Sequence, residues 1–236
     1  GCAAGLASLG ACWWHESAVP AILPKDRPAT SPIAEGTYCG LEADETGVMI
    51  EKDCSRFTWD PDEHRLLVVE IDEDGEPGEE LWLDVAPISH GLTLLQIVNS
   101  ENEGLVLRYQ LFATLVRPEG LVMLPLPDGD VRNAIAGDEG LLLEPGEPDD
   151  ETRFILAGDP DAVRRMVERS AEAWLEAAAA PGVDRFAPFD PDAPDDFVAP
   201  RYTIRTDALD PDLDNVAAAE AALATLREAL EAAAAS

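Results

Sequence analysis

The residues of this chain that could do acid–base or nucleophilic chemistry are its histidines, serines and carboxylates. The three histidines are His15, His64 and His90, and Ser89 stands directly before His90. Neighbours on a strand point to opposite faces, so adjacency alone does not make Ser89 and His90 a catalytic pair. The sequence contains no GxSxG, HExxH or P-loop motif and no glycine fingerprint between strand and helix. It therefore assigns no catalytic residue and no cofactor.

Carboxylates recur in a fixed pattern that could suggest calcium. The triplet Asp-Pro-Asp occurs four times, starting at Asp60, Asp159, Asp190 and Asp210. The match of DPDLDNVAAAE to an EF-hand loop is poor, because Asn215 replaces the turn glycine and Glu220 comes one position early. We expect Asp159 and Asp210 to cap helices whose first residue is the following proline, and the other two triplets to form turns. No metal site is predicted.

The composition restricts the class of partner. The chain of 236 residues has 48 acidic against 16 basic side chains, a net charge of −32, and is 46% hydrophobic. A surface of this sign repels phosphate backbones, which excludes nucleic acid as a partner and disfavours anionic lipid headgroups. The simplest interpretation of the charge is solubility, and the alternative is an acidic face for a basic partner or for cations.

Small and apolar residues fill positions 2–14, a run too short to span a bilayer as a helix. Within it, Leu9-Gly10-Ala11-Cys12 has an aliphatic residue, two small residues and a cysteine. This motif resembles the lipobox of bacterial lipoproteins. The resemblance implies that residues 1–11 are the remnant of a signal peptide and that Cys12 carries the lipid. It also implies a lipid-anchored protein of the bacterial cell envelope, on the periplasmic or outer-membrane side.

The other cysteines are consistent with that location. Cleavage before Cys12 removes Cys2 and leaves Cys39 and Cys54. A disulfide between these two would close a loop of about fifteen residues, worth roughly 3 kcal/mol in the chain-entropy model. An even remainder suits an oxidising compartment such as the periplasm, and two buried free thiols are the alternative.

Prolines dominate the segment that follows the lipobox. Pro20, Pro24, Pro28 and Pro32 are each four residues apart. Proline at this spacing disfavours both helix interiors and sheets. We therefore expect residues 12–35 to form an extended tether, able to reach roughly 60–70 Å at about 3 Å per residue.

Residues 36–127 read as an antiparallel β region. Eight short apolar runs are separated by turn residues, and they cover residues 36–41, 46–52, 55–60, 64–71, 80–88, 91–98, 105–116 and 120–126. In the run from Leu105 to Val116 apolar residues alternate with Arg108, Gln110 and Thr114, which predicts a sheet covered on one face. We expect a meander of about eight strands, as a curled sheet or small barrel, with an open sheet packed on helices as the alternative.

Residues 128–236 form a mixed region with helices. Residues 153–157 and 201–205 read as strands, and a helix follows Asp159 with an apolar stripe at helical spacing. A second helix is expected from Asp210-Pro211 to Ala235, with a short heptad-like seam. Both helices are expected to pack on the β region, although the seam could instead meet a partner helix. The fold class is therefore α+β.

These features support three hypotheses of different classes. The first is a non-catalytic, lipid-anchored envelope protein that serves as an accessory or structural subunit of a membrane-associated complex. Its partners would be the membrane, through Cys12, and an envelope protein. The alternative is a periplasmic small-molecule-binding lipoprotein with an apolar cavity in the β region. The third is a hydrolase without a recognisable motif.

Overall fold

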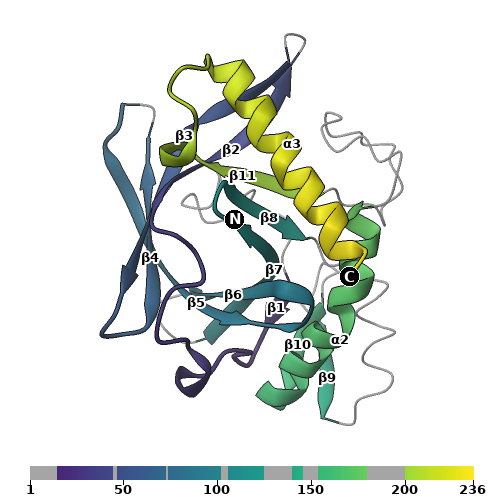
Figure 1. Ribbon diagram of the computed structural model, residues 1–236. Coiled ribbons are helices and arrows are strands. Elements are labelled where there is room, and N and C mark those ends of the chain that lie inside the picture. The colour runs from purple at the N-terminus through teal and green to yellow at the C-terminus, as the bar shows by residue number, and fades with distance from the viewer. Residues whose placement is uncertain are drawn as a thin grey trace.

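Figure 1 presents the computed structural model of the chain. The structure describes residues 15–44, 47–72, 74–101, 106–124, 140–145, 154–179 and 200–236. These residues form a β-barrel with two long helices packed against its outside (Figure 1). The predicted α+β class, with an antiparallel β region followed by helices, is confirmed.

Eight antiparallel strands close the barrel. They are β2 (Gly36–Asp44), β3 (Gly47–Asp60), β4 (Arg65–Ile71), β5 (Pro77–Pro87), β6 (Leu92–Glu101), β7 (Val106–Arg117), β8 (Gly120–Leu124) and β11 (Arg201–Arg205). The ring closes because β6 pairs with β7, and because β11 pairs with both β2 and β8. Barrel closure satisfies the backbone groups that an open sheet would leave at its two edges.

Two differences from the predicted meander concern which segments supply the strands. The runs at residues 46–52 and 55–60 are one continuous strand, β3, because the residues between them contain no glycine or proline to turn the chain. The eighth strand is instead β11, from the C-terminal region. The barrel is therefore complete only when residues far apart in the sequence have come together.

Three further strands extend the sheet from β7. The short strand β1 (His15–Ser17) pairs antiparallel with β7 and parallel with β10 (Phe154–Gly158), which pairs in turn with β9 (Leu141–Pro145). Both β1 and β8 occupy the same edge of β7, one after the other along the strand. The β9–β10 hairpin therefore joins the barrel through β1.

The apolar side chains form two cores, one on each face of the barrel wall. The inner core includes Tyr38, Phe57, Leu83, Phe112 and Leu121. The outer core lies between the barrel and the helices α2 (Pro160–Ala179) and α3 (Asn215–Ala234). Both faces of β7 are consequently buried, and Gln110 and Thr114, which the alternation assigned to a polar face, are 2% and 0% exposed.

The helices begin at caps of the expected kind, although at one unexpected position. The backbone amide of Asp161 donates to the Asp159 side chain at 3.1 Å, and α2 begins at Pro160 as predicted. In contrast, α3 begins at Asn215, and Asp214 caps it by accepting from the amide of Ala217. Residues 210–213 form a turn in which the Leu213 amide donates to the Asp210 carbonyl at 3.2 Å, so the predicted helix start at Asp210-Pro211 is wrong. Neither described helix is long and apolar enough to cross a membrane.

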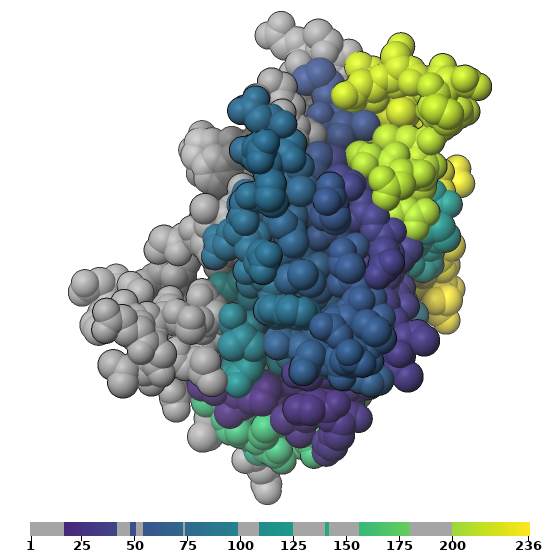
Figure 2. Space-filling view, turned by 90° about the vertical axis from the view of Figure 1, so that its left-hand side faces the viewer, coloured from purple at the N-terminus to yellow at the C-terminus, as the bar shows by residue number. Residues whose placement is uncertain are grey.

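The structure also differs from the expected tether, in the part that it describes. Residues 15–35, named here the N-terminal segment, lie against the barrel strands and include fully buried side chains at Ala21, Ile22 and Ile33. Figure 2 shows this segment in purple, packed against the blue strands that follow it in the sequence. Proline does keep the segment out of long helices and strands, but the apolar residues between the prolines bind it to the barrel.

Candidate functional site

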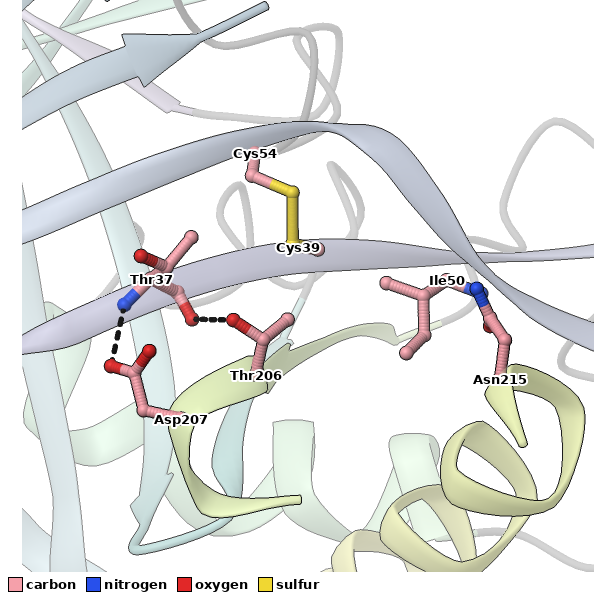
Figure 3. The surroundings of a disulfide bond; sticks show 7 residues. All are labelled: Thr37, Cys39, Ile50, Cys54, Thr206, Asp207 and Asn215. Atoms are coloured by element: carbon pink, nitrogen blue, oxygen red, sulfur yellow. Dashed lines mark hydrogen bonds between the residues drawn. A yellow bond between two sulfur atoms is a disulfide. The ribbon is translucent and has the colours of Figure 1, made fainter. Parts of the chain in front are cut away.

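The predicted disulfide between Cys39 and Cys54 is present (Figure 3). It joins β2 to β3 at directly paired positions, with the Cα atoms 4.3 Å apart. Such close pairs are the positions of an antiparallel ladder at which a disulfide fits. Cys12, the predicted lipid attachment site, lies outside the described residues.

The C-terminal part of the chain is fastened to β2 and β3 beside this disulfide (Figure 3). In the short helix η4 (Thr206–Ala208), Asp207 accepts from the amide of Thr37 at 3.0 Å. The Thr206 hydroxyl donates to the Thr37 carbonyl at 3.2 Å. At the start of α3, Asn215 accepts from the amide of Ile50 at 3.1 Å. The disulfide therefore lies where η4 and α3 meet the barrel, and its surroundings are structural contacts.

A buried ionic group lies on the other side of the barrel, and we name Arg27, Arg65, Asp84 and Gln96 the Asp84 cluster. Asp84 is 3% exposed, and its Oδ1 atom is 2.8 Å from Nε of Arg27 and 3.0 Å from Nε of Arg65. These contacts are ion pairs rather than well-directed hydrogen bonds. Its Oδ2 atom accepts from the Gln96 amide at 3.0 Å. Both carboxylate oxygens are thus occupied.

The Asp84 cluster holds the N-terminal segment on the barrel. Gln96 accepts from the backbone amides of Ala21 and Ile22, at 2.7 and 3.0 Å, and donates to the Ile22 carbonyl at 3.1 Å. Arg27 belongs to the segment itself, and its guanidinium also donates to the carbonyl of Glu63. The cluster therefore neutralises a buried carboxylate and satisfies the backbone of a segment that has no ladder partner there.

Sequence reasoning missed this cluster, although one signal was available. Asp84 stands in the apolar run LWLDVAP, within a strand. A charged side chain in such a run is buried only with partners, so an ion pair could have been expected. The partners of Asp84 could not have been identified from the sequence, because Arg27 and Arg65 lie in separate elements.

His64 and Ser89 have structural partners. Nδ1 of His64 donates to the carbonyl of Pro28 at 3.0 Å, which adds another contact to the N-terminal segment. The Ser89 hydroxyl donates to the backbone carbonyl of Glu168 in α2 at 2.9 Å. His90 follows in the short helix η3 (Ser89–Gly91) with a φ of 56° and is exposed. Ser89 is thus engaged with α2 and not with a neighbouring base.

The Asp-Pro-Asp triplets in the described residues act on their own backbone. Asp60 accepts from the amides of Asp62 and Glu63, at 2.8 and 3.1 Å, and Asp210 accepts from the amide of Asp212 at 3.0 Å. The triplet at Asp190 lies outside the described residues. Within the described ranges, no three His, Cys, Asp or Glu side chains gather as metal ligands.

Polar groups also lie inside the barrel. The Tyr38 hydroxyl donates to the Ala34 carbonyl at 2.8 Å, and burial raises the pKa of Tyr38 to about 12, although the neighbouring Arg205 opposes that rise. On β7, Gln110 and Thr114 share the inner face with Phe112. The Thr114 hydroxyl is buried and has no hydrogen-bond partner among the described residues.

Comparison with protein families, curated proteins and solved structures found no match for the chain.

Proposed function

We propose that the protein is a lipid-anchored domain of the bacterial cell envelope that serves as a non-catalytic accessory subunit of a membrane-associated complex. The disulfide between Cys39 and Cys54 carries this proposal, because disulfides persist in oxidising compartments such as the periplasm. The lipobox-like sequence that ends at Cys12 supplies the membrane anchor. The two observations are independent, since one is a covalent bond within the barrel and the other a motif outside it.

A role through surface contact is supported by how the polar groups are used. Ser89, His64 and Asp84 all make contacts that join separate segments of the fold. The barrel is thereby fastened to both the N-terminal segment and the C-terminal helices. A body of this kind, with a strongly acidic composition, is suited to present a preformed surface to a basic region of a partner protein.

The experiment is native mass spectrometry of the protein, extracted gently in detergent from its own membranes. We expect a mature chain that begins at Cys12, carries a diacylglycerol on its thiol, and is accompanied by a second protein in fixed stoichiometry. The variant Cys12→Ser should lose the lipid, whereas Cys2→Ser is the matched control and should keep it. An unmodified Cys12 would overturn the anchor, and a bare protomer would overturn the subunit role.

A second candidate function has its own support in the barrel interior. Eight-stranded barrels are either filled by side chains or hold one small ligand. The Thr114 hydroxyl, which is buried on the inner face and has no hydrogen-bond partner among the described residues, offers a hydrogen bond to such a ligand. In the same experiment, a lone protomer with a small additional mass beyond the lipid would favour ligand carriage. Replacement of Thr114 by valine should then reduce the fraction of protein that carries this mass.

A further inference from the structure

We propose that a lipid on Cys12 holds the barrel directly against the bilayer, without an intervening tether. This inference rests on the proposed lipid anchor and specifies its geometry. Only Trp13 and Trp14 separate Cys12 from His15, the first residue of β1. Three residue steps span at most about 11 Å. The attachment point of the lipid therefore lies within about 11 Å of the sheet.

Strand β1 has no freedom to lengthen this connection, because it is an internal strand. His15 is paired with Leu111 of β7, and Glu16 is paired with both Gln110 of β7 and Ile155 of β10. Just after β1, the amide of Ala18 donates to the carbonyl of Leu156 at 2.7 Å. The chain is thus paired on one side at His15, its first described residue, and on both sides from Glu16 onward.

The rest of the N-terminal segment is fixed as well. Its backbone is bound by Gln96 at Ala21 and Ile22, and its Arg27 is paired with the buried Asp84. Near its end, the Ala34 carbonyl accepts from the Tyr38 hydroxyl. Residues 15–35 would have to leave all these contacts to act as a spacer. The reach of the anchor is therefore set by the two tryptophans.

The register also indicates where on the barrel the anchor begins. On one edge of β7, His15 lies opposite Leu111 and Leu124 of β8 lies opposite Ala113. Only the position opposite Phe112 separates the two strands on that edge. The connection to Cys12 thus starts at the junction of β1 and β8, on the side of the barrel. In Figure 1 the start of α3 lies at the top of the view, whereas β1 lies below the middle.

The test is neutron reflectometry of the lipid-anchored protein on a supported phosphatidylcholine bilayer, whose zwitterionic headgroups avoid repulsion of the acidic domain. The matched variant carries twenty Gly and Ser residues between Trp14 and His15, a linker with an r.m.s. length of about 25 Å. We expect the native protein layer to begin within about 11 Å of the headgroups, and the variant to add a water-rich gap of about 25 Å. Equal gaps for the two proteins would overturn the inference.

Two further measurements separate this inference from the proposed function. If native Cys12 carries no lipid, the proposed function fails, but a chain that begins at Cys12 can be coupled through its thiol to a maleimide lipid and measured in the same way. Slow hydrogen exchange of the Ala18 amide in both proteins is expected, because the inserted linker leaves β1 paired. Rapid exchange in the anchored native protein would overturn the inference, since β1 would then have left the sheet.

Discussion

The Asp84 cluster allows a sharp prediction about stability, because a buried carboxylate there faces two guanidinium groups. Asp84→Asn keeps the volume of the side chain and removes its charge. Removal of one partner from a buried ion pair costs about 3–5 kcal/mol. The side chains of Arg27 and Arg65 are 16% and 20% exposed, so water partly solvates the charges left behind, and the lower end of that range applies. We therefore expect a loss of about 3 kcal/mol.

Urea unfolding followed by circular dichroism measures this loss as a change in the free energy of unfolding. In a chain of this size, about 3 kcal/mol corresponds to a fall in Tm of about 6–12 °C. Glu80→Gln is the matched control, because Glu80 lies on the same strand but is exposed, and it should stay within about 0.5 kcal/mol of the parent. If Asp84→Asn behaves like this control, the Asp84 cluster does not stabilise the attachment of the N-terminal segment to the barrel.

Three further predictions concern the covalent, titratable and steric features of the barrel. Replacement of both Cys39 and Cys54 by alanine should lower the free energy of unfolding by about 3 kcal/mol, and addition of a reductant to the variant should cause no further loss. Burial raises the pKa of Tyr38 to about 12, so the stability that the neutral phenol contributes is complete below pH 10 and is lost between pH 10 and about 12. Urea unfolding over this pH range should show a smaller decline in the free energy of unfolding for Tyr38→Phe than for the parent. Gly120→Ala would drive a Cβ atom into a backbone carbonyl of β11 and should destabilise the barrel by about 1–3 kcal/mol, whereas Gly78→Ala, which meets only a flexible side chain, should change stability little in the same urea assay.

The β region illustrates how far local patterns reach. Turn residues and alternation identified the strands from β2 to β8, because a two-residue period and Asp/Gly/Pro turns are properties of neighbouring residues. The same patterns could not indicate that β11 would be inserted between β2 and β8. Gly120, at the start of β8, has no side chain to obstruct the approach of β11, but a glycine after a turn is common to many hairpins.

The helix caps show the same limit on a smaller scale. Both Asp159 and Asp210 precede a proline, and local preference ranks them as equivalent helix starts. Only Asp159 precedes the helix directly, whereas Asp214 caps α3. The contact of Asn215 with Ile50 fixes α3 against the barrel at that residue, so tertiary packing selects between two acceptable starts.

Short-range patterns in the sequence predicted the antiparallel strands and the two amphipathic helices, and the small number of cysteines made a bond between Cys39 and Cys54 an expectation that the structure confirms. The tertiary structure alone decided that the barrel closes through β11 and that Asp84 pairs with Arg27 and Arg65. It also decided that the proline-rich residues 15–35 belong to the folded body. The spacing of the prolines predicts that residues 15–35 form no long helix or strand, but it does not predict which surface of the protein buries their apolar side chains. That surface exists only after the barrel has closed.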